Sequence, residues 1–122
     1  MDRKQAAADF LQHCASGNPG EGYRKYASQR FRHHNAHFPG DAESLMKGME
    51  ANARQFPDKA LDIKHVMQDG DLVAVHSHVR HTPEEPGFAL VHIFRFEGDR
   101  IAELWDIAQE VPKDSPNRHG MF

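Results

Sequence analysis

Apolar residues follow a helical period at the start of the chain. They recur at i, i+3, i+4 and i+7, which predicts an amphipathic helix over residues 3–15. The stripe consists of Ala7, Phe10, Leu11 and Cys14. A run of helix breakers at 16–20 ends this helix, and residues 23–27 could add a short second one.

A second helical period begins after an irregular stretch. Residues 31–40 are rich in aromatic residues and histidine and show no regular period. Asp41 is a good N-cap for the helix that follows, because its carboxylate can accept from exposed backbone N–H groups. The apolar stripe of this helix is Leu45, Met49 and Phe56, and the pair Pro57-Asp58 ends it.

The period changes to two from residue 61 onward, which predicts strands. Leu61, Ile63 and His65 alternate with polar residues, and a hairpin turn follows at 68–71. A strand over 72–81 and a loop with two prolines over 82–87 come next. Two faces of the 72–81 strand differ: one carries Val73, Val75 and Val79, and the other Leu72, Ala74, His76 and His78. Helices followed by antiparallel strands indicate an α+β fold.

The last hairpin, residues 88–109, contains the most informative polar residue. Along its first strand one face consists of Phe88, Leu90, His92, Phe94 and Phe96. His92 is therefore either a core histidine or part of a pocket. A three-residue turn at 97–99 would pair His92 with Leu104 and place Asp106 two residues along on the same face. A two-residue turn would instead put Asp106 on the opposite face.

Composition limits the class of protein. A chain of 122 residues fits a single domain over 1–122, and 39% hydrophobic with 27% charged residues is ordinary for a soluble protein. A net charge of -3 without a Lys/Arg cluster argues against nucleic acid as a partner. A single cysteine, no apolar leader and no apolar run near about 18 residues favour a cytoplasmic protein without a membrane partner.

Several stretches together resemble the SnoaL-like polyketide cyclase family of the nuclear transport factor 2-like (cystatin-like) superfamily. They are GDLVAVHSHV at 70–79, VHIFRFEGDRIAELWDIAQ at 91–109, the ending NRHGMF at 117–122, and HHN at 33–35, which looks like the family's HN. The resemblance implies a cone-shaped, curved antiparallel sheet wrapped around the N-terminal helices and enclosing an apolar pocket. It also implies a homodimer through the sheet and acid/base chemistry without metal or cofactor, such as aldol-type ring closure or isomerisation.

Two positions depart from the family's pattern. Relatives often have Asp where this chain has His92, and often have His where it has Leu104 in ELWD. In ketosteroid isomerase, which shares the fold, the residue that matches His92 donates a hydrogen bond to the developing oxyanion. This chain thus has a histidine at position 92, where relatives often have the acid, and lacks the histidine that they often have at position 104 of the same face.

The chemistry of enolisation identifies the candidate catalytic residues. Removing a proton next to a carbonyl needs a base and a donor for the oxygen that becomes negative. His92 and Asp106 are the expected pair and His34 the next candidate. A carboxylate nearby would raise the pKa of His92, and burial would lower it. The residues expected to line the site and bind a small-molecule substrate are His76, His78, Leu90, Phe94, Leu104 and Ala108.

Other interpretations stay open. Asp106 could merely pair with Arg95 or Arg100, and Glu103 with Arg95 reads most simply as a cross-strand pair on the surface. His76 and His78, at i and i+2 of one strand, could bind a metal as in cupins, although a second cupin motif is not apparent. The domain could also bind a small apolar ligand, or dimerise, without catalysis, because fold alone does not decide function.

Overall fold

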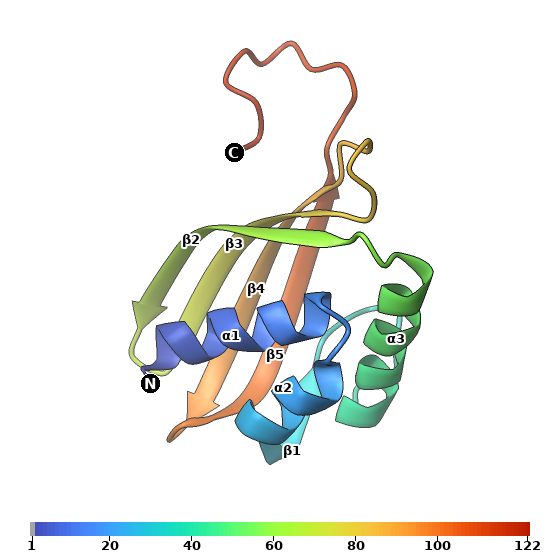
Figure 1. The fold of residues 1–122 in the computed structure, drawn as a ribbon. Helices are drawn as coiled ribbons and strands as arrows, with labels where there is room; N and C mark the ends of the chain where they lie inside the picture. Colours follow the sequence, from blue (N-terminus) through green and yellow to red (C-terminus); the bar gives the residue numbers. More distant parts are fainter. Residues whose placement is uncertain (1) are drawn as a thin grey trace.

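Three helices and a five-stranded sheet make up the computed structural model, which describes residues 2–122 (Figure 1). The elements in chain order are α1 (Arg3–Ala15), α2 (Pro19–Tyr26), β1 (Ala27–His33), α3 (Ala42–Gln55), β2 (Ala60–Asp69), β3 (Leu72–Arg80), β4 (Phe88–Glu97) and β5 (Arg100–Glu110). The fold is α+β, as the sequence predicted. None of the helices in the described part of the chain is long and apolar enough to span a membrane.

Side-chain caps fix where α1 and α3 begin. Asp2 and Gln5 form a capping box at α1, with the Gln5 N–H donating to the Asp2 carboxylate at 2.8 Å. The predicted cap of α3 is confirmed, because Asp41 accepts from the Ser44 N–H at 2.9 Å. The start of α2 was predicted too late. Pro19 belongs to the first turn of this helix, where its fixed φ and missing N–H are tolerated.

The sheet is mixed: the antiparallel pairs that were predicted are present, and one parallel pair that was not predicted is added. The strand order is β1-β5-β4-β3-β2, and β1 runs parallel to β5 while the other neighbours are antiparallel. β1 also lies between two helices, in a segment that was predicted to be partly irregular. Its only buried residues, Phe31 and His33, are too few to show a period of two without knowledge of the partner strand.

A bulge in β2 changes which residues face the helices. Leu61 and Ile63 are half-buried as predicted, but the register shifts between Ile63 and His65. Val66 therefore takes the inward position that the alternation assigned to His65. His65 lies on the outer face, where its Nδ1 atom is 2.9 Å from Nδ1 of His76.

A second bulge determines the register of the final hairpin. Glu97 pairs with Arg100, so the turn has two residues, with Gly98 at a φ of 62°. The pairs then shift from Phe96–Ile101 to Arg95–Glu103, which leaves Ala102 as the extra residue of a bulge. A two-residue turn alone would place Asp106 on the face opposite His92. The extra residue shifts β5 by one position and returns Asp106 to the face of His92. His92 pairs directly with Asp106, two positions from the predicted register but on the same face.

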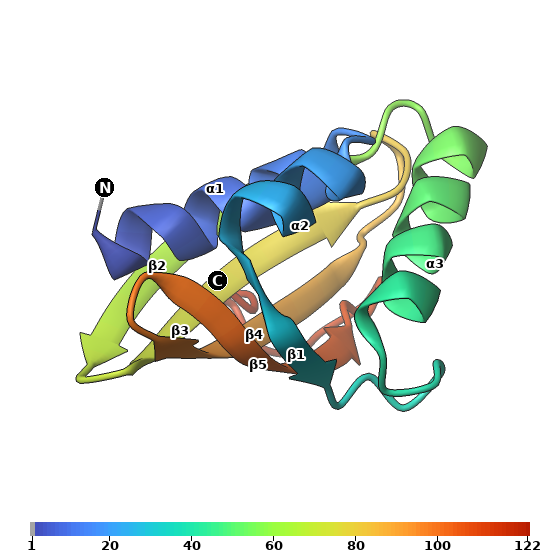
Figure 2. The same cartoon turned by 90° about the horizontal axis from the view of Figure 1, so that it is seen from below.

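The core lies between α1, α2 and the inner face of the sheet (Figure 2). At its centre the Phe10 ring meets Tyr23 and Phe94 edge to face, with centroids 5.0 and 5.9 Å away. The apolar contributions of β3 are Val73, Val75 and Val79. These three valines point toward the helices, and the histidines of β3 therefore lie on the outer face of the sheet.

Replacing Phe10 by Ala should destabilise the fold strongly, since the side chain is fully buried (0% exposed) and its removal leaves a cavity. We expect a loss of about 3–5 kcal/mol in the free energy of unfolding, measured by urea denaturation. Met67→Ala, at a position 60% exposed, is the control and should change it by less than about 1 kcal/mol. Equal effects of the two variants would contradict this description of the core.

Candidate functional site

A cavity of about 510 Å³ opens where the loop after β1 and helix α3 meet strands β3, β4 and β5. It contains both members of the predicted acid/base pair. Its lining includes His34, Asn35, Phe38, Met49, Asn52, Lys59, His81, Phe88, Leu90, His92, Asp106 and Ala108. Two larger hollows, of about 730 and 870 Å³, flank α2 but contain neither His92 nor Asp106. We therefore place the candidate site in the smaller cavity.

Gly48 of α3 shapes one wall of this cavity. A Cβ atom at this position would lie 2.4 Å from Cε1 of Phe38, too close for any side chain. The glycine lets the Phe38 ring of the preceding loop pack directly against the helix. The loop that also includes Asn35 is thereby held beside the cavity.

His92 is almost completely buried, with 8% of its surface exposed. Its Nδ1 atom is buried and has no hydrogen-bond partner within residues 2–122. Burial lowers the pKa of His92 and outweighs the nearby Asp106 carboxylate, which raises it, while the Lys59 ammonium lowers it further. Of the two opposed effects expected from the sequence, desolvation is thus the stronger, and the imidazole is neutral near pH 7.

Asp106 is half-buried and held by the loop after β1. The Asn35 side-chain amide donates to Oδ2 of Asp106 at 2.8 Å. Asn35 is itself fixed, because its Oδ1 accepts from the His37 N–H at 2.9 Å and its own N–H donates to Nδ1 of His33 at 3.1 Å. Neither Arg95 nor Arg100 pairs with Asp106; both have other partners. No hydrogen bond joins Asp106 to His92 in the part of the chain that the structure describes.

The structure places the imidazole of His34 away from this pair. His34 borders the cavity, but its ring stacks on Trp105 at a centroid distance of 5.1 Å, and its Nε2 lies 2.6 Å from Glu103. Both partners are on the outer face of β5. A catalytic role for His34 stays a prediction; its side chain has partners on the outer face because consecutive residues beside β5 alternate between the two faces.

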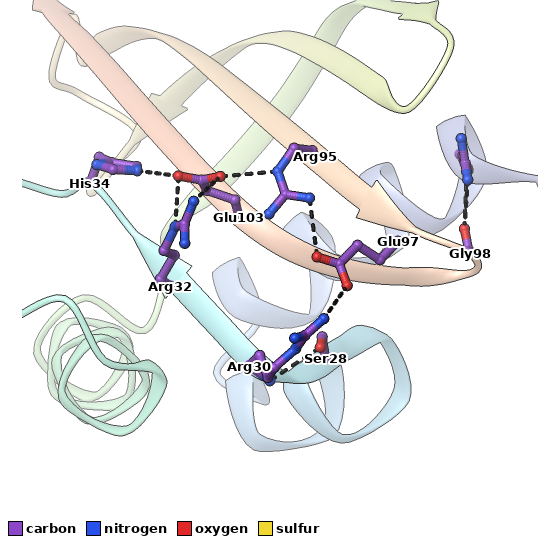
Figure 3. A network of polar contacts seen from close by, with 9 residues as sticks. Ser28, Arg30, Arg32, His34, Arg95, Glu97, Gly98 and Glu103 are labelled. Carbon is purple, nitrogen blue, oxygen red and sulfur yellow. Dashed lines mark hydrogen bonds and ion pairs between the residues drawn. The ribbon is translucent and has the colours of Figure 1, made fainter.

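Glu103 connects three basic side chains (Figure 3). Arg32 binds both carboxylate oxygens, at 2.9 and 3.1 Å, and Arg95 donates at 3.0 Å. These hydrogen bonds, from Arg32 first and then His34 and Arg95, lower the pKa of Glu103 to about 2. The predicted cross-strand pair with Arg95 exists, but Glu103 is only 5% exposed and is not a surface charge.

His76 and His78 do not line the cavity, which corrects their predicted role. They share the outer face of β3, where both stack on the C-terminal Phe122, and Nε2 of His78 lies 2.7 Å from the Pro86 carbonyl oxygen. No group of three His, Cys, Asp or Glu side chains that could hold a metal ion occurs among residues 2–122. The two histidines are neighbours of the tail rather than of His92.

The four apolar residues predicted for the site separate into two layers. Leu90 and Ala108 line the cavity. Phe94 and Leu104 share their face but are fully buried in the core below it. The sequence interpretation missed Asn35, Asn52 and Lys59. The HHN motif pointed to the neighbourhood of Asn35, whereas no local signal marked the other two.

Comparison with known proteins agrees with this architecture. Residues 7–104 match the SnoaL-like domain, and the chain belongs to this family. No match to a curated protein was found. A loop-truncation variant of IdmH from Streptomyces antibioticus has 23% identity and a TM-score of 0.75, covering 88% of this chain and 93% of that one. A cystatin-fold protein from Novosphingobium aromaticivorans has 22% identity and a TM-score of 0.71, with coverages of 88% and 98%.

TsrD from Streptomyces laurentii is a third similar structure. It shares 20% identity at a TM-score of 0.71, and the match covers 89% of this chain and 91% of TsrD. At such identities these structures establish the fold, which is that of nuclear transport factor 2-like or cystatin-like proteins. The site residues must be argued from this chain itself.

His92 should make the stability of the protein depend on pH. Its pKa is lower in the folded than in the unfolded chain, where about 6.5 applies, so the unfolded state binds more protons. The free energy of unfolding should fall as the pH decreases from 7 to 5. In His92→Gln this fall should be smaller, as measured by urea denaturation at each pH. The exposed His119→Gln is the control, and an unchanged slope in His92→Gln would contradict the burial of a neutral imidazole.

Proposed function

We propose that this protein catalyses enolisation of a small carbonyl compound, using its own side chains as acid and base. One observation carries the proposal: His92 and Asp106 are direct cross-strand partners in one cavity. The two groups differ in environment. Asp106 is half-buried and held by an amide, and His92 is buried and neutral. Such a difference separates the roles of base and hydrogen-bond donor.

Asp106 is the base in this proposal. Its carboxylate takes the proton from the carbon next to the carbonyl, and the C–H electron pair moves into the new C–C double bond while the carbonyl oxygen becomes negative. The Asn35 amide keeps the carboxylate oriented. Returning the proton to the same carbon regenerates the ketone, returning it to another carbon gives isomerisation, and attack of the enolate on a second carbonyl gives aldol-type cyclisation.

His92 supplies the donor for the enolate oxygen. A neutral imidazole carries one N–H, and an oxyanion in a poorly hydrated cavity gains much from such a bond. The burial that lowers the pKa of His92 suits this role, because it keeps the ring from becoming a cation that would pair with Asp106. IdmH, one of the similar structures, is provisionally described as a polyketide cyclase, which agrees with chemistry of this class.

The test measures exchange of α-protons in D₂O. We expect the protein to accelerate deuterium incorporation into 2-tetralone, followed by NMR. Asp106→Asn should lower the rate at least about 100-fold because the base is lost, and His92→Leu by about 100-fold because leucine has no donor for the oxyanion. Asp99→Asn, in the exposed 98–99 turn, is the matched control and should keep the full rate.

Thermal unfolding of each variant shows whether it is folded. Folded Asp106→Asn and His92→Leu proteins with unimpaired exchange would overturn the catalytic proposal. Binding of ketones with no exchange in the wild-type protein would favour the alternative of a non-catalytic ligand-binding domain.

A homodimer through the sheet stays a prediction, and the outer face of β5 supports it. Ile107 is 60% exposed there beside the half-buried Trp105, while the C-terminal tail covers the same outer face further along the sheet, at β3. Light scattering should give twice the chain mass of 13.9 kDa. Ile107→Glu should give the monomer, because an unpaired charge is costly in an interface. A monomeric wild-type protein at tens of micromolar would contradict the prediction.

A further inference from the structure

Lys59 is a cation in the cavity, and it has no anionic partner among the described residues. It follows α3 in the chain, and its backbone N–H donates to the Phe56 carbonyl at 3.1 Å. Its side chain is half-buried and lines the same cavity as His92 and Asp106. Nζ donates to Oδ1 of Asn52 at 2.6 Å, and no carboxylate within residues 2–122 forms an ion pair with it.

Neighbouring acidic groups do not compensate this charge. Cys14 lies close enough to interact with Lys59, but burial raises the pKa of its thiol to about 12, so the thiol stays neutral. Asp106 is engaged by Asn35. Burial in turn lowers the pKa of Lys59, which shows that its ammonium is already partly desolvated. A partly desolvated charge with a single neutral partner is costly unless an anion approaches it.

The charge of Lys59 acts inside the cavity. It lowers the pKa of His92, so its field reaches the residue that is proposed to bind the enolate oxygen. Asn52 fixes the position of the ammonium and lines the cavity too. Two functional ends therefore share one cavity: the Lys59–Asn52 pair, which can receive an anion, and the His92–Asp106 pair, which acts on a carbonyl.

We infer that the cavity selects a ketone that carries a carboxylate, with the carboxylate bound by Lys59 and Asn52 and the ketone placed at His92 and Asp106. That this ligand is a substrate rests on the proposed function. The preference for an anion, however, is a binding property that can be measured without turnover. The inferred substrate class is small oxo acids rather than neutral ketones.

Two probes that share a ketone and differ in the charge of one group, with one methyl group added, test the inference. 3-Oxoindane-1-carboxylate and its methyl ester present the same ketone, and their affinities are measured by calorimetry at low salt. We expect the acid to bind the wild-type protein at least about 10-fold more tightly than the ester, which corresponds to about 1.4 kcal/mol. Added salt should reduce this ratio because it screens the attraction.

Variants of Lys59 assign the preference to the residue. Lys59→Met should make the two affinities equal, and Lys59→Arg, which keeps the charge, should preserve the ratio. Lys64→Met, on the outer face of β2 where Lys64 pairs with Asp62, is the matched control and should behave as wild type. Equal binding of acid and ester by the wild-type protein, or an unchanged ratio in folded Lys59→Met, would overturn the inference.

The site of binding is checked by NMR. Lys59 also borders the hollow beside α2, so the bound acid must perturb the ring resonance of His92, which is identified by its loss in His92→Gln. Binding without this perturbation would overturn the inference as well. Preferred binding of the acid without α-proton exchange would reject the proposed catalysis while leaving the anion site established, so the two failures are distinguishable.

Discussion

The single extra residue at Ala102 is the constraint on which the candidate site depends. A two-residue turn joins β4 to β5, and an uninterrupted ladder after it would pair His92 with Trp105. With the bulge, Leu104 enters the core, Asp106 reaches the cavity, and Glu103 points to the opposite face. Four consecutive buried residues, Ile101 to Leu104, mark this position. The energetic reason is burial: a shift by one residue would turn the buried Leu104 out of the core and bring Trp105 to the inner face.

The two strands of the final hairpin hold buried groups in two different electrostatic environments. On the outer face, Glu103 is buried but surrounded by donors, which keep it ionised. On the inner face, His92 is buried without compensating donors, and its charged form is disfavoured. Burial alone therefore does not determine protonation. The number of hydrogen bonds to the charged form decides whether a buried group remains an ion or becomes neutral.

The loop after β1 links both faces to the helices. Consecutive residues of this segment alternate, so that His34 joins Glu103 and Trp105 while Asn35 joins Asp106. The loop then returns to α3, whose glycine admits the Phe38 ring. One short segment thus orients the proposed base, closes a wall of the cavity and ties the outer network to β5. Parallel pairing of β1 with β5 makes this possible.

The sequence by itself determined the local structure and the class of fold. The period of α1, the Asp41 cap, the hairpin at residues 68–71 and the inward face with His92 follow from spacing that only a few neighbouring residues decide. The family resemblance agreed with the fold. The placement of His76 and His78 in the site was wrong, since a strand with valines on one side and histidines on the other is compatible with either face turning inward.

Only the tertiary structure decided the contents of the site. Bulges in β2 and β5 change register without a clear local signal, so the pairing of His92 with Asp106 could not be read from turn length. Lys59 and Asn52 meet because a loop follows the helix closely, and their desolvation depends on everything packed around them. Periodicity reports which face a residue occupies. Contacts between distant segments, and the electrostatics that result, depend on how those faces are brought together.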